Sequence, residues 1–403
     1  AVPTTTVAPT TTAVPTTTVA PTTAAPEATD TPGSQPFNPF ASAGAEQREC
    51  FIQAVGPDRF DQLISGSRPT GNEGAMIGPC MALSTSGPAG GQGGIPDIGS
   101  CVTEDPSGYG RPDHAFLLGM KVFQLRPQGN QSVSSAADIT ALGMNTASLS
   151  FQIPFDDEGH VHYPAKIFGF SHPDLASSLC DIGNLIHQMK TAGLSVYVSG
   201  EPVYYDLAQG IEPPPLEPGI VPTYLADLSP VMEGLAAVGE KYQVDWLAPI
   251  SEPDKYFGPV AADDFMQSMR TTFSDFGGKL VWQVYGLDSV RLDLSGYDVA
   301  GLAVIGCDDP IDGVFDTYIP TVVAWAQEDE VPEIAHVEFG CVGRPGNESA
   351  AIANYDRWYN STVGFATGLI VLDNPSDSPN PQQVVGTWLE NWVVGIAEER
   401  GLK

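Results

Sequence analysis

Two glutamates are marked out by their context, because each lies at the end of a long apolar run in the 403-residue sequence. Glu252 follows the run VDWLAPI at residues 244–250 and precedes Pro253. Glu338 is the second-last residue of the run EIAHVEF at residues 333–339. A carboxyl group at the end of a buried strand loses hydration, so it is retained mainly where it is paired or chemically active. Two such groups can divide acid–base and nucleophilic chemistry between them.

Further polar and aromatic residues at the ends of other apolar runs are candidate substrate contacts. They are Asp156, Glu201, Tyr204, Ser251, Tyr256, Tyr285, Asp308 and Asp373. Cleavage of a glycosidic bond needs two carboxyl groups across the sugar from each other, and aromatic faces can stack on the sugar ring. Tyr285 is a candidate hydrogen-bond partner of Glu338, and equally an aromatic cap on the protein core. With 49 acidic residues in the chain, a carboxylate at any one position has a fair chance of arising without a role.

The elements that would carry these residues alternate between apolar strands and amphipathic helices. Strands are predicted at residues 115–125, 146–155, 194–204, 244–250, 279–285, 299–306, 333–339 and 368–372. Helices are predicted at 135–143, 175–189, 224–242, 261–276, 313–327, 349–360 and 382–400. Strands that are apolar over most of their length indicate a parallel sheet covered on its outer face. A count of eight favours an α/β fold closed into a (β/α)8 TIM barrel, whose active site lies at the C-terminal ends of the strands.

Two other enzyme folds fit the pattern less well. An open doubly wound sheet would share the alternation, but no GxGxxG motif or P-loop follows the first strand. A serine hydrolase is disfavoured because no GxSxG elbow is present.

In this strand order the sequence resembles the clan A glycoside hydrolases, over residues 114–403. The string SEP at 251–253 follows the fourth strand, where the clan usually has Asn-Glu-Pro, and VEFG at 337–340 is similar to its signature at the seventh strand. The resemblance implies a retaining enzyme with Glu252 as acid/base and Glu338 as nucleophile, their carboxyl groups roughly 5 Å apart. The usual asparagine hydrogen-bonds the sugar 2-hydroxyl, so serine at its position is a departure. The eighth strand also lacks the aromatic residue found there in many members, and the family within the clan, the sugar and the linkage stay open.

Two rival functions remain on the sequence. A non-catalytic barrel that binds glycans on the cell surface is favoured slightly by these two departures, whereas the presence of both glutamates argues against it. A metal-dependent hydrolase is disfavoured because the chain has only six histidines. His160 and His162 are expected to be exposed to solvent, and we expect neither a metal nor a cofactor. His336 is expected to point the same way as Glu338, one layer deeper, as a hydrogen-bonded core residue.

The N-terminal third has a different character. Residues 1–35 are predicted to be a disordered Pro/Thr-rich linker, because AVPTTTVAPTTT is followed by the near-identical AVPTTTVAPTTA. Residues 36–112 are predicted to form a small Cys-bearing helical module with helices at 45–66 and 72–83, and residues 113–403 the catalytic barrel. The predicted disulfides are Cys50–Cys80, Cys307–Cys341 and Cys101–Cys180, although six cysteines allow 15 pairings.

Charge and cysteine content limit the partners. The formal net charge is −32, from 49 acidic and 17 basic residues, which argues against nucleic acid and anionic membranes as partners and disfavours a polyanionic substrate. The same charge also fits a surface adapted for solubility or salt. An even number of cysteines beside a Thr/Pro-rich stalk favours an oxidising compartment. We therefore expect a secreted or cell-surface protein that acts on a neutral polysaccharide or oligosaccharide, with no membrane insertion; its oligomeric state stays open.

Overall fold

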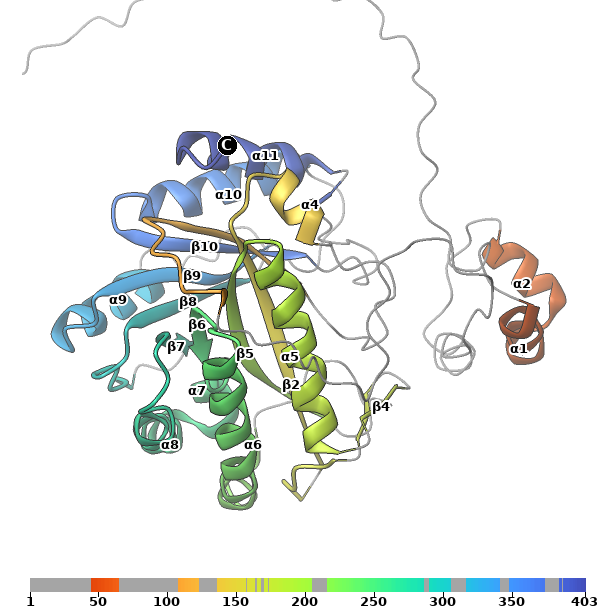
Figure 1. The fold of residues 1–403 in the computed structure, drawn as a ribbon, viewed down its shortest axis with the longest axis horizontal. Coiled ribbons are helices and arrows are strands. Elements are labelled where there is room, and N and C mark those ends of the chain that lie inside the picture. Colours follow the sequence, from red (N-terminus) through yellow and green to blue (C-terminus); the bar gives the residue numbers. More distant parts are fainter. Residues whose placement is uncertain are drawn as a thin grey trace, which may run out of the picture.

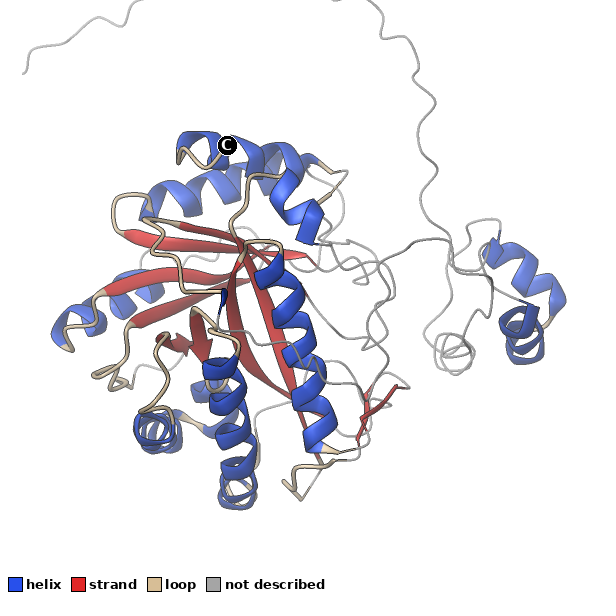
Figure 2. Cartoon of the chain, viewed as in Figure 1, coloured by secondary structure: helices blue, strands red, loops and turns tan. Residues whose placement is uncertain are grey.

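Eight parallel strands close into a barrel with helices on its outside (Figures 1 and 2). In this computed structural model the described residues are 45–64, 108–122, 136–156, 158–163, 165–167, 170–172, 174–204, 216–285, 290–305, 317–340, 348–373, 384–385 and 387–403. The order of strands around the barrel is β1-β2-β5-β6-β7-β8-β9-β10, and β10 pairs with β1 to close it. The predicted (β/α)8 barrel is therefore confirmed.

The strands and helices follow the predicted order with small changes of length. The barrel strands are β1 Leu117–Val122, β2 Thr146–Phe155, β5 Ser195–Tyr204, β6 Trp246–Ala248, β7 Lys279–Val284, β8 Val299–Ile305, β9 Glu333–Gly340 and β10 Ala366–Asp373. The helices around them are α4 Ala136–Ala141, α5 Leu175–Thr191, α6 Val221–Lys241, α7 Pro253–Phe257, α8 Pro259–Thr272, α9 Ile319–Glu328, α10 Glu348–Thr362 and α11 Trp388–Glu399. Helix α7 was not predicted, nor was an antiparallel ribbon of β3 (Ala165–Ile167) and β4 (Phe170–His172).

Alternation along the strands divides the apolar residues into two cores. Outward-facing residues such as Leu149 and Phe151 of β2 pack with the helices in one large cluster. A smaller cluster fills the barrel interior and comprises Leu117, Tyr197, Trp246, Ala248, Val281, Val299, Ala335, Val337 and Ile370. Successive strand residues point to opposite faces, so Lys121 of β1 and Glu201 of β5 lie on the same inward faces as Leu117 and Tyr197. The interior is therefore apolar low in the barrel and charged toward its C-terminal end.

A helical pair precedes the barrel in the chain. The predicted helix at 45–66 is two helices, α1 (Ala45–Val55) and α2 (Pro57–Ile64). Gly56 separates them with φ +83°, a backbone conformation that favours glycine. The predicted linker and the predicted helix at 72–83 lie outside the described residues.

Both described cysteines are in disulfides. Cys50 and Cys180 are each disulfide-bonded, and no described cysteine is free. The other four cysteines lie outside the described residues, so the three predicted pairings stay predictions. Among the described helices, none combines the length and apolar character that a membrane span requires.

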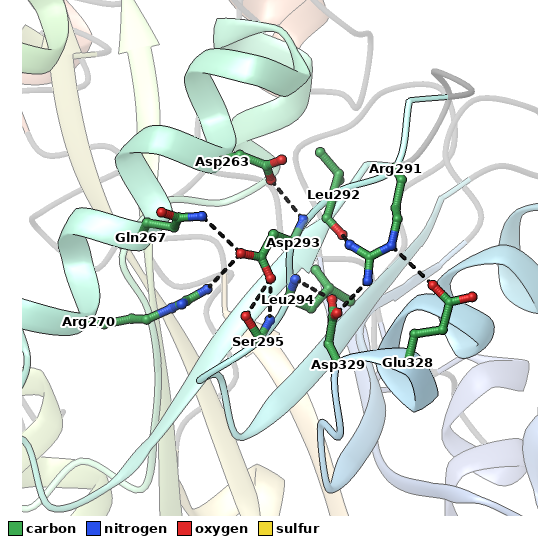
Figure 3. A network of polar contacts seen from close by, with 10 residues as sticks. All are labelled: Asp263, Gln267, Arg270, Arg291, Leu292, Asp293, Leu294, Ser295, Glu328 and Asp329. Atoms are coloured by element: carbon green, nitrogen blue, oxygen red, sulfur yellow. Dashed lines mark hydrogen bonds and ion pairs between the residues drawn. The ribbon is translucent and has the colours of Figure 1, made fainter.

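A polar network replaces a helix in the described part of the β7–β8 connection, at residues 290–298 (Figure 3). Asp329, at the end of α9, accepts a hydrogen bond of 2.7 Å from the Leu294 amide and pairs with Arg291. Arg291 also contacts Glu328 at 3.1 Å. These contacts tie the connection to the turn before β9, at the end of the barrel opposite to Glu252.

Asp329→Ala is expected to lower the free energy of unfolding by about 1–3 kcal/mol, because it leaves the Leu294 amide without its acceptor. The matched change Glu328→Ala removes only an exposed ion-pair partner and should cost less than about 1 kcal/mol. Urea unfolding of both variants measures the difference. Equal losses would show that the amide contact contributes nothing of its own.

Candidate active site

Glu252 is placed at the barrel mouth by a sharp turn directly after β6. The Ser251 amide donates a hydrogen bond of 2.7 Å to the Gly200 carbonyl, which holds the chain against β5. Glu252 then adopts a left-handed conformation with φ 49° and ψ 50°, and Pro253 begins α7. A non-glycine residue in this region is strained, and such strain is concentrated at functional sites. The Glu252 side chain is thereby buried, and the residue is only 6% exposed.

Glu338 reaches the interior because β9 contains a β-bulge. On β8, Leu302 pairs with His336 and the next residue, Ala303, pairs with Glu338, so Val337 is an extra residue without a counterpart on β8. A bulge of this kind re-aims the side chains that follow it. Glu338 contacts the inward-facing Lys121, although the alternation without a bulge would place it with His336. Glu338 is 4% exposed.

The same bulge corrects the expectation for His336. This residue does not point the same way as Glu338. Its Nε2 lies 2.8 Å from the Thr362 hydroxyl of α10, so the ring faces the helices. Burial lowers the pKa of His336 to about 3, so the imidazole is neutral. It is a hydrogen-bonded core residue, as expected.

Lys121 is a site residue that the sequence analysis missed. It is 0% exposed, and its ammonium donates to Glu201 Oε1 at 2.6 Å and to Glu338 Oε1. Burial alone lowers the pKa of Lys121, but the two carboxylates raise it by more, so the lysine stays charged. The only signal in the sequence is a single lysine inside an apolar strand, because a buried ammonium requires partners.

Glu201 completes the group from β5. Ser199, two residues earlier on the same face, donates a hydrogen bond of 2.8 Å to the oxygen that also accepts from Lys121. The pKa of Glu201 is raised overall, because burial and the charge of Glu338 together outweigh the lowering by Lys121 and Ser199. The carboxyl is partly exposed, unlike that of Glu338.

Glu252 has a different electrostatic environment from Glu338. Burial, aided by the negative charge of Glu338, raises the pKa of Glu252 to about 8 against the opposing effect of Lys255. The Lys255 ammonium lies 3.0 Å from Glu252 Oε2 and 4.9 Å from the centre of the Tyr285 ring. At neutral pH the Glu252 carboxyl is therefore protonated, whereas Glu338 directly contacts an ammonium group.

Of the three tyrosines predicted to contact substrate, the two whose side chains are described differ in their surroundings. Tyr285 lies beside Lys255, on the side of the site that holds Glu252, and its amide donates to Asp254 at 2.9 Å. Tyr256 is 5% exposed and packs in the outer core. The Lys255 ammonium, which pairs with Glu252, lies 5.3 Å from the centre of the Tyr256 ring, and a contact of this ring with substrate stays a prediction. The side chain of Tyr204 lies outside the described residues.

Two predicted acids instead hold loops, and one falls outside the described residues. Asp373, 2% exposed, accepts a hydrogen bond of 3.0 Å from the Val384 amide. Asp156 accepts from the backbone amides of Glu158 and His160 and lies 2.5 Å from His162 Nε2. Asp373 is the last residue of β10 and Asp156 directly follows β2, where loop amides are available as donors, so both have structural partners. A contact of either with substrate stays a prediction. Asp308 lies outside the described residues.

The two histidines after β2 each contact a carboxylate. His160 Nδ1 lies 3.0 Å from Asp227 on α6, and His162 contacts Asp156. Among the residues that the structure describes, no group of three or more His, Cys, Asp or Glu side chains is arranged to hold a metal ion.

Comparison with solved structures finds the same fold in β-mannanases. The GH113 β-mannanase AaManA from Alicyclobacillus acidocaldarius, solved in complex with ManMIm, matches with a TM-score of 0.51 and 14% identity, over 72% of this chain and 99% of that one. A second GH113 β-1,4-mannanase matches with a TM-score of 0.51 and 13% identity, over 70% of this chain and 98% of that one. No protein-family model and no curated protein matches the sequence. At identities this low, the structural likeness shows a shared fold alone.

The pKa of Glu252 predicts a pH-dependent stability that needs no substrate to measure. Its folded pKa of about 8 lies above the value of roughly 4.3 for an unfolded glutamate, so stability is fully present below pH 4 and is lost as pH rises toward 8. Relative to Glu252→Gln, the wild type should lose up to about 1.4 kcal/mol per pH unit between pH 5 and 8. The exposed Glu398→Gln is the control and should show a constant difference. Urea unfolding at several pH values tests this, and a Glu252→Gln difference that does not change with pH contradicts it.

Proposed function

We propose that the protein is a retaining glycoside hydrolase in which Glu252 is the acid/base and Glu338 the nucleophile. The observation that carries this proposal is the contrast between the two carboxyl groups. Glu252 is buried with a pKa of about 8, and Glu338 contacts the Lys121 ammonium. Titratable pairs whose environments separate their protonation states are the pattern of acid/base assignment in glycosidases.

The first half of the reaction forms a covalent intermediate. A Glu338 carboxylate oxygen attacks the anomeric carbon and forms a C–O bond, while the bond from that carbon to the leaving oxygen breaks. Glu252 donates its proton to the leaving oxygen, so the leaving sugar departs as a neutral alcohol. The charge of Glu338 disappears in the ester, and the charge of Glu252 appears.

The second half reverses these roles. Glu252, now a carboxylate, takes a proton from water as the water oxygen attacks the anomeric carbon. The bond to Glu338 breaks and returns its electron pair to the carboxylate. Two inversions at the same carbon give retention of configuration. Lys255, next to Glu252, stabilises the acid/base while it is ionised.

A neutral polysaccharide is the proposed substrate class. The surplus of acidic residues, 49 against 17 basic ones, disfavours a polyanion. β-1,4-Mannan is the first candidate, because both solved structures named above are β-mannanases. The Pro/Thr-rich sequence of residues 1–35 and the disulfide-bonded Cys50 and Cys180 support a secreted or cell-surface location.

Glu338→Gln should reduce turnover by about a thousandfold or more while the variant stays folded, because the nucleophile is lost. Assays use a panel of neutral polysaccharides that includes β-1,4-mannan, with circular dichroism to verify folding. Glu333→Gln, at the other end of β9, is the matched control and should keep its activity. Binding without turnover in the wild type would favour the rival, a glycan-binding barrel.

Glu252→Ala should slow the hydrolysis of substrates with poor leaving groups most, because an activated aryl glycoside needs little proton donation. Azide should partly restore this variant by attacking the glycosyl-enzyme, giving a glycosyl azide of retained configuration. Product configuration is read by NMR. An inverted product would contradict the retaining mechanism.

Lys255→Met should move the alkaline limb of the kcat/KM profile to higher pH. The limb reports loss of the Glu252 proton with a pKa near 8, and Lys255 lowers that pKa, so its removal raises it. Lys279→Met, which removes an ammonium paired with Glu333, is the control and should leave the limb in place. A limb that stays in place in both variants would show that Lys255 does not act on the titrating group.

A further inference from the structure

We propose that Glu201 is the permanent counter-ion of Lys121 and keeps the ammonium paired while Glu338 is esterified to the sugar. The inference rests on the proposed function for its kinetic meaning. Lys121 and Glu201 are thus positioning residues, which set the charge around the nucleophile through the course of the reaction.

The geometry places one ammonium between two carboxylates. Lys121 is fully buried and donates to Glu201 at 2.6 Å and to Glu338. The charges of these two carboxylates are what raise its pKa. Ser199 donates to the same Glu201 oxygen at 2.8 Å, which fixes that carboxyl against the ammonium.

The charge balance of this trio changes during the reaction. Before attack, two carboxylates and one ammonium sum to −1; in the glycosyl-enzyme, Glu338 is a neutral ester. Without Glu201 the buried ammonium would then have lost the charge that offsets its desolvation, which is costly. With Glu201 the trio becomes a neutral ion pair, so both states of the nucleophile are compatible with a buried lysine.

Glu201→Gln should therefore slow formation of the intermediate and hasten its breakdown. Attack in this variant converts a Lys121–Glu338 ion pair into a lone buried cation, whereas hydrolysis restores the pair. We expect kcat/KM for an aryl glycoside of the cleaved sugar to fall about tenfold or more, which corresponds to roughly 1.4 kcal/mol. The pre-steady-state burst expected of the wild type with an activated leaving group should disappear.

Two variants serve as controls for the kinetic test. Ser199→Ala removes a hydrogen bond to Glu201 but leaves its charge, so the burst should persist. Glu201→Asp keeps the charge and should recover part of the loss. A burst in Glu201→Gln equal to that of the wild type overturns the proposal.

A stability cycle tests the same pairing without substrate. Glu201→Gln and Glu338→Gln each leave Lys121 one carboxylate, and Glu338→Gln also imitates the uncharged, esterified nucleophile. The double variant leaves the ammonium without either charge. Its shift in urea midpoint should exceed the sum of the two single shifts, or it should fail to fold where both single variants fold. Adding Lys121→Met to the double variant should recover stability.

The two arms separate the two claims. Additive shifts in the double variant would refute the counter-ion role even if Glu338→Gln is inactive. Non-additive shifts in a protein whose Glu338→Gln variant keeps its turnover would leave the pairing intact and reject the proposed nucleophile.

Discussion

The burial of one ammonium group, that of Lys121, is the constraint on which the candidate site depends. A charge inside a protein is stable only when it is neutralised and hydrogen-bonded, so Lys121 requires acids within reach. Glu201 of β5 and Glu338 of β9 supply them from strands on either side of β1 in the closed sheet. The apolar cluster beneath them excludes water, and burial is also the largest cause of the raised pKa of Glu252. Fold and site are coupled through this one residue.

The spacing of apolar residues predicted the fold well wherever it was regular along a whole strand or helix. Strand β2 has the predicted bounds, because its ten residues alternate between the interior and the helix-covered face. Strand β6 is shorter than the predicted 244–250, because its regular pairing with β5 ends at Ala248. The Ser251 amide still hydrogen-bonds to Gly200 of β5, and the chain then turns at Glu252. A turn made by backbone contacts to another strand leaves no mark in the local pattern. The ribbon of β3 and β4 was missed for a similar reason, because strands of three residues are too short to show alternation.

Site residues could be predicted where the neighbouring sequence marks them, and could not where their role depends on contacts with residues far away in the chain. Glu252 and Glu338 follow from their positions at strand ends. Lys121 does not, because its partners are 80 and 217 residues away in the sequence. The orientation of His336 was wrong because a strict alternation of two ignores the extra residue at Val337. Bulges depend on how neighbouring strands register, which one strand's sequence does not encode.

Acidic residues are abundant in this chain and are therefore poor markers of a site, whereas basic residues are scarce and informative. Asp156 and Asp373 accept hydrogen bonds from backbone amides of loops, which gives these carboxylates a structural role. Lys121 and Lys255, two of only 17 basic residues, contact Glu201, Glu338 and Glu252, the three glutamates of the candidate site among the described residues. Cations and loop amides both act on the protonation of a carboxyl group: burial raises the pKa of Asp156, but His162 and the amides of His160 and Glu158 lower it by more. The pairs Lys190–Asp245 and Lys279–Glu333 lie away from the candidate site, so a lysine contact alone does not mark it. What distinguishes the site is one fully buried ammonium, that of Lys121, shared by two carboxyl groups.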